Sequence, residues 1–425
     1  MNYTKKDLGS YNLHLIKTDK LKTITIRVIF HTPIKKEDIT KRTVLSDILL
    51  QSSEKYETRR EMTIEAEELY SADISTNNQR IGNYIVTSIN LQVLNDSYTE
   101  EGNLEKAIAF LHEIIFHPDI EKKAFKKEKL DIAKYNSVVS ISSMKEEATS
   151  YSITRLMEAY DKDSPVSFRM TGYLEDLEKI TEQNLYESYC HMIDNDYVDI
   201  FVVGNIEKKE MTSLIKKYFK FKKIKKRKAS YFLKNKKPRK RRLIAKETIQ
   251  NTQSKLAIAC PIKKLKPFER DYVLVLANLI LGGGSDSKLF QEVREKNSLC
   301  YTIHSMASKL DNLLIITAGI DRNNYTKTVE LITKNLNELK RGHFTEKDIE
   351  KAKEYYHTSL EEIEENENRM ISEVLSMEII GLDPVETRME KMNTVKKQDI
   401  VKVLKKIDMD TIFLLEGVKN EEDNS

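Results

Sequence analysis

The chain has 425 residues, which is more than one compact core usually holds, so we expect two domains of about 200 residues each. Its 71 basic and 67 acidic residues leave a net charge of only +4, so the chain as a whole has no strong preference for a polyanionic partner. Cys190, Cys260 and Cys300 are odd in number and far apart, which excludes a disulfide framework and a cysteine zinc site. No segment approaches the roughly 18 apolar residues of a membrane span, and no signal-peptide pattern is found, so we expect a soluble, cytoplasmic protein.

The first half alternates between predicted strands and amphipathic helices. Period-2 alternation predicts strands over 12–16, 23–30, 73–77, 83–94 and 196–206. Apolar residues at helical spacing predict helices over 41–53, 63–70, 104–116, 121–160, 181–193 and 208–219. We expect the unusually long helix 121–160 to break near Ser137 to Ser143, where Val and Ser cluster.

A basic segment separates the two halves. Between Lys222 and Arg242 there are 13 Lys or Arg residues and no acid, and Pro238 interrupts any periodicity. We therefore expect a solvated linker over 222–243. A nucleic-acid patch is the alternative, although no recognisable binding fold accompanies the charge.

The second half repeats the order of the first. Its predicted elements are strands at 255–260, 301–308 and 312–320, and helices at 268–281, 287–294, 325–340 and 345–365. The segment KITEQNL at Lys179 resembles TVKKQDI at Thr394, and IFVVG at Ile200 resembles IFLLEG at Ile412. We therefore predict an α+β protein with two homologous α/β-sandwich units, 1–221 and 244–425, each with a mainly antiparallel sheet and flanking helices.

The stretch from Leu281 to Tyr301 is the best candidate for a binding site. Three glycines end an apolar helical run, a short helix follows, Arg294 lies near its end, and Tyr301 opens the next strand. The candidate substrate-binding residues are Gly282, Gly283, Gly284 and Ser285, because bare backbone can approach a ligand there. The simpler interpretation is a helix-loop-strand connection with Arg294 in a surface ion pair.

No standard metal or nucleophile motif is present. HEIIFH, from His112 to His117, differs from the zinc motif H-E-x-x-H because the second histidine comes at i+5, about 140° around a helix from the first. GGGSDSK lacks the Gly-Lys-Ser/Thr ending of a P-loop, and no G-x-S-x-G occurs.

With its duplication, the chain resembles the insulinase-type (pitrilysin) metallopeptidase family, in particular its shorter members built like the processing peptidases. The likeness spans nearly the whole chain, and its most specific part is LFQEVREKNSLCYTIHS, similar to the family's arginine-tyrosine segment. Family peptidases carry H-x-x-E-H on the first helix, where this chain reads TVLSDILLQSSEKY. Val44, Asp47 and Ile48 occupy those positions, and Glu128 lies near the expected third ligand.

The resemblance is therefore closest to partner subunits that lack the zinc motif and act beside an active peptidase. It implies a clamshell arrangement, no metal and no cofactor on this chain, and no autonomous hydrolysis. It also implies that a homologous H-x-x-E-H subunit binds the zinc, while Arg294 and Tyr301 contact the peptide substrate and the oxyanion in trans. A wholly inactive relative that binds peptides or assembles a complex is the alternative.

Overall fold

The computed structural model describes residues 1–224 and 230–418. Two compact units are found, and neither is one continuous half of the chain. Unit 1 contains the described residues of 1–142, 169–230 and 362–376, and unit 2 those of 143–168, 231–361 and 377–425. Each unit therefore includes a segment from the other half of the chain. The helix α5 (Ala148–Asp161), from the first half, packs on strands of unit 2, and the first part of α12 (Glu367–Ile380), from the second half, belongs to unit 1. The domain boundaries at 221 and 244 stay a prediction for the two repeats.

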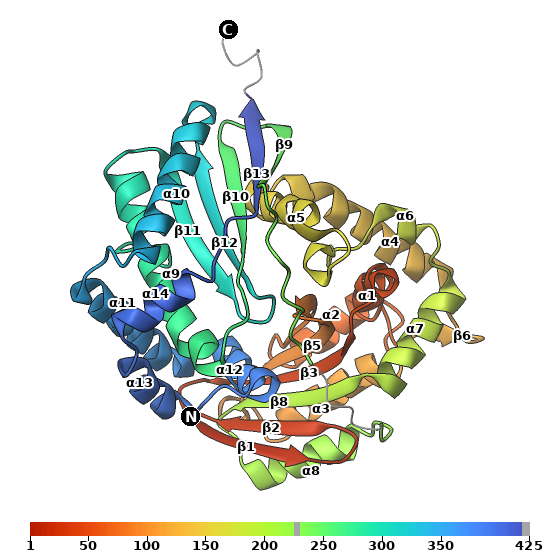
Figure 1. The fold of residues 1–425 in the computed structure, drawn as a ribbon. Helices are drawn as coiled ribbons and strands as arrows, with labels where there is room; N and C mark the ends of the chain where they lie inside the picture. The colour runs from red at the N-terminus through yellow and green to blue at the C-terminus, as the bar shows by residue number, and fades with distance from the viewer. Residues whose placement is uncertain (225–229, 419–425) are drawn as a thin grey trace. The chain divides into compact units, whose positions relative to one another are not determined.

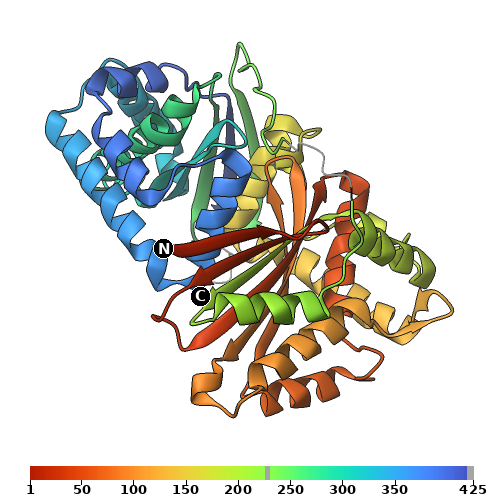
Figure 2. The same cartoon turned by 90° about the horizontal axis from the view of Figure 1, so that it is seen from below.

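Unit 1 is built on a sheet that has six strands within the described residues. In spatial order they are β1 (Asn2–Asp7), β2 (Asn12–Lys17), β8 (Tyr197–Gly204), β3 (Thr23–Pro33), β5 (Tyr84–Leu94) and β4 (Asp73–Ile81). Only β2 and β8 pair in parallel, and Figure 2 shows red β1 and β2 side by side at one end of the sheet. The polar strand β1 is not predicted from sequence, because NYTKKD has no apolar alternation.

All helices of unit 1 except the first part of α12 pack against one face of this sheet. They are α1 (Lys36–Ile48), α2 (Arg59–Glu68), α3 (Asn103–Phe116), α4 (Lys127–Ser142), α6 (Leu174–Leu177), α7 (Glu182–Asn195) and α8 (Lys208–Tyr218). A short hairpin, β6 (Ile120–Glu121) and β7 (Ala124–Phe125), precedes α4. The apolar sides of β3, β5, α1 and α3 form one core, which includes Ile26, Leu91 and Leu111. The predicted break in the long helix is confirmed, since α4 ends at Ser142 and α5 begins at Ala148.

Unit 2 repeats this topology. Its sheet has the order β11 (Cys300–Ser308), β12 (Leu313–Ile320), β10 (Ser254–Pro261), β13 (Thr411–Val418) and β9 (Leu243–Gln250) in the described part of the chain. This order corresponds to β4, β5, β3, β8 and β2, and β13 and β9 are again the parallel pair. The predicted α+β class, with two homologous units and mainly antiparallel sheets, is therefore confirmed (Figure 1).

The second half of the chain includes three helices that sequence reasoning does not predict. One face of the sheet is covered by α9 (Leu274–Leu281), α10 (Tyr325–Lys340), α11 (Glu346–Glu361), α13 (Val385–Asn393) and α14 (Lys397–Leu404), and α5 packs on the other. The unpredicted helices are α12, α13 and α14; α12 and α13 lack a clear apolar stripe. No helix of the described ranges combines the length and apolarity needed to cross a membrane.

The expected solvated linker is in part packed, which corrects the prediction for 222–243. Within residues 230–242, Tyr231 is buried and Arg239 forms an ion pair with Asp410, whose side chain is 0% exposed. A buried carboxylate needs a cation and hydrogen bonds, and Arg239 also bonds the Tyr160 carbonyl at 2.9 Å. Residues 225–229 lie outside the described residues.

Candidate functional site

The helix that carries the zinc motif in the family is a core helix in this chain. Val44 is 0% and Ile48 2% exposed, and both belong to the apolar core of unit 1. Two apolar side chains packed at the histidine positions offer no ligand to a metal. Among the described residues, no group of three or more His, Cys, Asp or Glu side chains is arranged to hold a metal ion.

Amide groups surround the side chain at the position of the family's catalytic glutamate. Asn136 of α4 donates to both carboxylate oxygens of Asp47, at 3.1 and 3.2 Å, and Gln51 donates to Oδ2 at 3.0 Å. Glu128 is exposed in the first turn of α4, about two turns before Asn136. The α4 side chain that bonds Asp47 is thus Asn136, and the expected place of Glu128 near a third ligand position stays a prediction.

The histidines of HEIIFH lie closer together than their spacing predicts. The rings of His112 and His117 have centroids 5.2 Å apart, because His117 lies just beyond the end of α3, at φ −125° and ψ 54°. The inference that they project from different sides assumed a continuous helix and is wrong. His117 Nδ1 is 3.2 Å from Glu54 Oε2.

Arg294 projects from a π-helical turn, Phe290–Glu295. Leu289 and Val293 anchor this turn in the core, and its end is closed by backbone bonds from Ser298 N to Arg294 O, at 2.9 Å, and from Leu299 N to Val293 O, at 3.0 Å. Ser298 adopts the left-handed conformation, with φ +49°, which lets the chain turn sharply into β11. Single π-helical turns often occur at functional sites, because they shift the side chains that follow.

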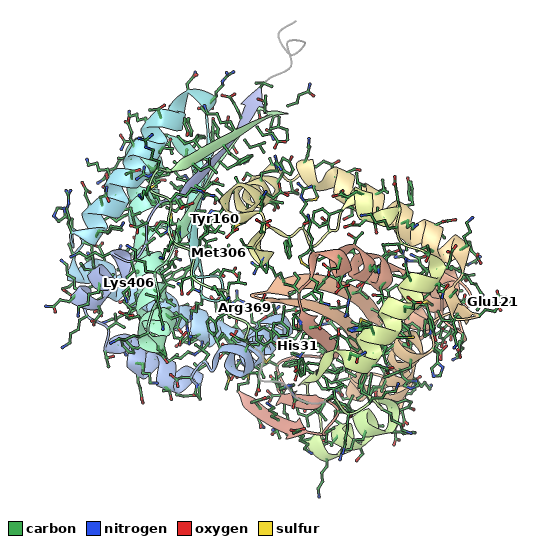
Figure 3. The ribbon with its side chains drawn as sticks, turned by 45° about the vertical axis from the view of Figure 1, so that its right-hand side comes forward. His31, Glu121, Tyr160, Met306, Arg369 and Lys406 are labelled. Atoms are coloured by element: carbon green, nitrogen blue, oxygen red, sulfur yellow. The ribbon has the colours of Figure 1, made fainter. Side chains whose placement is uncertain are left out.

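Tyr301 lies at a β-bulge on an edge strand. The register between β11 and β12 shifts between Cys300 and Thr302, so Tyr301 is the extra residue, and its side chain is 59% exposed. A bulge of this kind can re-aim a side chain out of the sheet. Cys300 beside it points inward, and burial raises the pKa of its thiol to about 11, against the opposing effect of Arg294. Met306, labelled in Figure 3, is exposed further along the same strand.

Arg294 and Tyr301 line one groove of unit 2, with a volume of about 380 Å³. Its lining consists of Arg294, Glu295, Ser298, Leu299, Cys300, Tyr301 and Asp321. The Arg294 guanidinium is 43% exposed, stacks at 4.7 Å from the Phe290 ring centre, and has only a loose contact of 3.6 Å with Glu295. The surface ion pair of the simpler interpretation is therefore present, and at 3.6 Å it is loose enough to leave the guanidinium open to solvent. The groove presents two hydrogen-bond donors, a guanidinium and a phenol, to solvent.

Two of the three glycines close a helix instead of facing a groove. The amides of Gly282 and Gly283 both donate to Asn278 O at 2.9 Å, and Gly282 O accepts from Ser305 N of β11 at 2.8 Å. A Cβ on Gly282 would lie 2.8 Å from Ser305 Oγ, and one on Gly283 would lie 2.8 Å from Leu279 Cα. Close packing at the end of α9 therefore accounts for these two residues.

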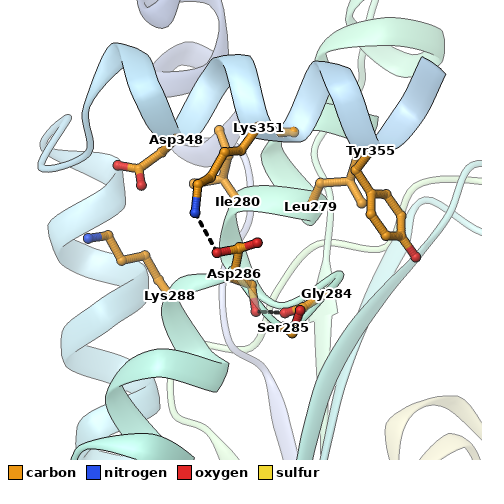
Figure 4. A pocket seen from close by; sticks show the side chains of 11 residues that line it. Leu279, Ile280, Gly284, Ser285, Asp286, Lys288, Asp348, Lys351 and Tyr355 are labelled. Carbon is orange, nitrogen blue, oxygen red and sulfur yellow. Dashed lines mark hydrogen bonds and ion pairs between the residues drawn. The ribbon is translucent and has the colours of Figure 1, made fainter. Parts of the chain in front are cut away.

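Gly284 and Ser285 line a second, much smaller pocket, of about 60 Å³ (Figure 4). Asp286 and Lys351 form an ion pair of 2.6 Å across it, and Tyr355 of α11 lines its rim. The structure thus separates Gly284 and Ser285 from the groove of Arg294 and Tyr301. Sequence reasoning also missed Asp321 as a groove residue and Asn136 beside Asp47; both are ordinary polar residues that no local motif identifies.

Comparisons with known proteins agree with this architecture. The family description "Peptidase M16 inactive domain" matches residues 179–356. A "Probable inactive metalloprotease", YmfF of Bacillus subtilis, is 28% identical over 426 residues, covering 99% of both chains. An "Uncharacterized zinc protease", YmxG of the same organism, is 28% identical over 60% of each chain. A solved structure of a conserved protein from Enterococcus faecalis is 29% identical, with a TM-score of 0.89 over 99% of this chain and 100% of that one.

These likenesses agree with the two-unit α+β fold. Helix α1 has the position of the zinc helix and none of its ligands. The chain is therefore similar to the insulinase/pitrilysin-type (peptidase M16) metallopeptidases over nearly its whole length, and its sequence lacks their H-x-x-E-H motif.

Proposed function

We propose that this chain is the substrate-binding, non-hydrolytic subunit of a zinc-dependent heterodimeric peptidase. The observation that carries the proposal is the shared groove of Arg294 and Tyr301, in which both polar groups are solvent-accessible. Its partner is a homologous cytoplasmic chain with H-x-x-E-H, which binds the zinc and activates the water.

The chemistry follows from the two side chains. Attack of water on a peptide carbonyl develops negative charge on oxygen, and the Tyr301 hydroxyl can donate a hydrogen bond to that oxyanion. The Arg294 guanidinium can hold a neighbouring peptide carbonyl or carboxylate through two parallel N–H bonds. Together they place the peptide and stabilise the transition state, while the partner performs hydrolysis.

The test is reconstitution with an H-x-x-E-H homologue of the same organism. We expect the two chains to co-purify and to cleave a quenched-fluorescent peptide together but not separately. Tyr301→Phe should lower kcat by about 10²–10³, the usual effect of removing one oxyanion donor, with the complex intact. Tyr355→Phe is the matched control, because Tyr355 is equally exposed but lies in the other pocket. Full activity in Tyr301→Phe would favour a wholly inactive, peptide-binding or assembly role instead.

A further inference from the structure

One edge of the sheet in unit 2 has no neighbouring strand among the described residues. In the strand order β11-β12-β10-β13-β9, the strand β9 pairs only with β13, beside which Figure 1 labels it. Its counterpart in unit 1, β2, has a neighbour on each side: β8 pairs with it in parallel, and β1 pairs with it antiparallel over six residue pairs. The described part of unit 2 therefore has no strand that corresponds to β1.

The segment before β9 does not cover this edge, because it is bound elsewhere in unit 2. In unit 1 a short turn joins β1 directly to β2. In unit 2 Leu233 N donates to Leu310 O at 2.8 Å, in the turn between β11 and β12. Arg239 N donates to the Asp410 carboxylate at 2.6 Å, just before β13. These bonds anchor residues 230–239 away from the outer side of β9, so that side stays open.

The backbone of β9 presents hydrogen-bonding groups to this open side at every second residue. Leu243 N donates to Asp410 O at 2.9 Å and Asn251 N to Val418 O at 3.2 Å, so the odd-numbered residues of β9 bond the neighbouring strand. The N–H and C=O groups of the even-numbered residues therefore point outward, and no described residue bonds them. They belong to Ile244, Lys246, Thr248 and Gln250.

Strand β9 lacks a bulge and a proline, two features that commonly prevent pairing at an exposed edge. Its register with β13 is unbroken over eight residue pairs, and its first two side chains, Leu243 and Ile244, are 37% and 55% exposed. The opposite edge strand, β11, has the bulge at Tyr301. The one lysine of β9, Lys246, lies over the Tyr325 ring at 5.1 Å from its centre. A regular, exposed edge of this kind is a template for a further strand.

Charge indicates which kind of strand fits this edge. Residues 240–250 contain four cations and one carboxylate, a net charge of +3. The carboxylate, Glu247, is already bound by α5, because Tyr151 donates to it at 2.6 Å and Arg155 at 2.7 Å. Lys240 and Arg241 are exposed and form no ion pair with the described residues. The edge therefore favours an acidic strand.

Two other occupants fit less well. A second copy of β9, in the antiparallel register that pairs all four outward residues, would set Glu247 directly opposite itself, and like charges in that position are destabilising. A nucleic acid would be attracted by the cations, but its phosphates only accept hydrogen bonds and would leave the outward C=O groups of β9 unpaired. A polypeptide backbone both donates and accepts at the required spacing.

We propose that the outer side of β9 binds an acidic, extended segment of another protein, which adds to the sheet as an antiparallel strand, as β1 adds to β2. Ala245 and Ile249 face the apolar cluster under α5, so the added side chains opposite them are apolar. Those opposite Lys246 and Arg242, on the other face, are acidic. The bound segment thus alternates apolar and acidic residues. This docking edge lies across the sheet from Tyr301 and does not depend on the proposed function.

The test measures binding of a fluorescein-labelled peptide to the full chain by fluorescence anisotropy at about 0.1 M salt. The peptide has about eleven residues, which is long enough to span β9 and the cations before it, and it alternates Val with Glu or Thr. Two control peptides carry Gln or Lys in place of each Glu. We expect the Gln peptide to bind at least about tenfold more weakly than the acidic one, and the Lys peptide more weakly still.

Variants of the edge separate strand addition from simple charge attraction. Thr248→Pro removes an outward N–H but no bond to β13, so it should keep the fold and lower affinity for the acidic peptide at least about tenfold, equivalent to about 1.4 kcal/mol. Thr248→Val keeps the N–H and should change affinity less than about twofold. Lys240→Gln with Arg241→Gln should lower it at least about threefold. Lys209→Gln with Lys216→Gln on α8 of unit 1 removes the same charge and should leave it unchanged.

Amide hydrogen exchange, resolved to single residues, tests the same proposal in the unaltered chain and stays available if Thr248→Pro disturbs folding. Adding the acidic peptide should slow exchange at Ile244, Lys246, Thr248 and Gln250, whose N–H groups point outward. The odd-numbered residues of β9 already bond β13, so their exchange should change less.

Several results would overturn the inference. They are no binding by the wild-type chain, equal binding of the acidic and Gln peptides, and wild-type affinity in Thr248→Pro. Loss of binding in Lys240→Gln with Arg241→Gln, but not in Thr248→Pro, would show a surface for polyanions such as nucleic acid instead of strand addition. A dimer of the chain that dissociates in Thr248→Pro would assign the edge to a second copy. Loss of peptide binding only in Arg294→Ala with Tyr301→Phe would place the peptide in the groove.

Discussion

Asn136 of α4 donates hydrogen bonds to both carboxylate oxygens of Asp47 on α1, at 3.1 and 3.2 Å. By sequence resemblance, Asp47 stands about where the zinc peptidases of the similar family have their catalytic glutamate. A carboxylate bonded to two amides, Asn136 and Gln51, and flanked by buried Val44 and Ile48, is a stable helix contact. Asp47 thus contributes to the packing between α1 and α4.

The first prediction concerns metal. The isolated chain, purified without a chelator, should contain less than about 0.1 zinc per molecule by elemental analysis, because neither Val44 nor Ile48 can supply a ligand. Adding the metal should leave its thermal unfolding unchanged, since a specifically bound ion would stabilise the native state. One zinc per chain would contradict the absence of a site.

The second prediction concerns the contact between α1 and α4. Asn136→Ala should lower the free energy of unfolding by about 1–3 kcal/mol, because the half-buried Asp47 loses two hydrogen bonds. Glu128→Ala on the same helix is the control and should change it by less than about 0.5 kcal/mol, as Glu128 is exposed. Urea denaturation of both variants checks this, and equal effects would show that the contact contributes nothing.

The third prediction distinguishes the glycines at the end of α9. Gly282→Ala and Gly283→Ala should each destabilise the protein by about 1–3 kcal/mol, since their Cβ atoms would approach Ser305 and Leu279 to 2.8 Å. Gly284→Ala should be tolerated, because the nearest atom to its Cβ would be Tyr355 Cε2 at 3.9 Å. Thermal unfolding of the three variants is the measurement, and a uniform effect would argue against steric packing as the cause.

A buried carboxylate links three strands of unit 1. Asp199 of β8 accepts from His14 Nε2 at 2.9 Å and from Asn12 at 2.8 Å, and its other oxygen lies 2.7 Å from His31 Nε2. His31 is labelled in Figure 3. Burial alone would raise the pKa of Asp199, but the bonds and charges of the two histidines outweigh it and hold that pKa well below its usual range.

The fourth prediction follows from the sign of this shift. Because the folded pKa of Asp199 lies below the unfolded value of about 3.9, its contribution to stability is fully present above that pH and is lost as the pH falls further. Asp199→Asn should lower the free energy of unfolding by about 3–5 kcal/mol at neutral pH. It should also make that free energy depend less on pH in the acid range. Urea denaturation at several pH values between about 2 and 7 tests this. A loss of stability on acidification as steep as that of the wild type would refute it.

The fifth prediction concerns thiol reactivity. Burial raises the pKa of Cys260 to about 12 and that of Cys300 to about 11, so at pH near 8 few of these thiols are ionised. Cys190 on α7 is only partly buried and should be the single residue that reacts quickly with a disulfide reagent in the native chain. Cys190→Ser should abolish the fast phase. A remaining fast thiol would show that Cys300 is reachable from the groove.

The sequence by itself determined the features that depend on local pattern. Alternating strands such as Thr23–Pro33, the helix Tyr325–Lys340 and the break before Ala148 follow from side-chain periodicity, which each segment carries within itself. The duplication and the missing zinc ligands at Val44 and Ile48 were likewise readable from sequence, because they concern the order and identity of residues. The helices α12 and α13 were not, since neither segment has a clear apolar stripe at helical spacing.

Only the tertiary structure decided which distant residues meet. It brought Asn136 to Asp47, placed Asp321 in the groove with Tyr301, and set part of α12 across the polar face of unit 1. It also showed that Gly282 and Gly283 close a helix, while the bulge at Tyr301 turns that side chain outward. Such contacts depend on packing between segments far apart in the chain, and the polar residues that make them have no local periodicity to predict their partners.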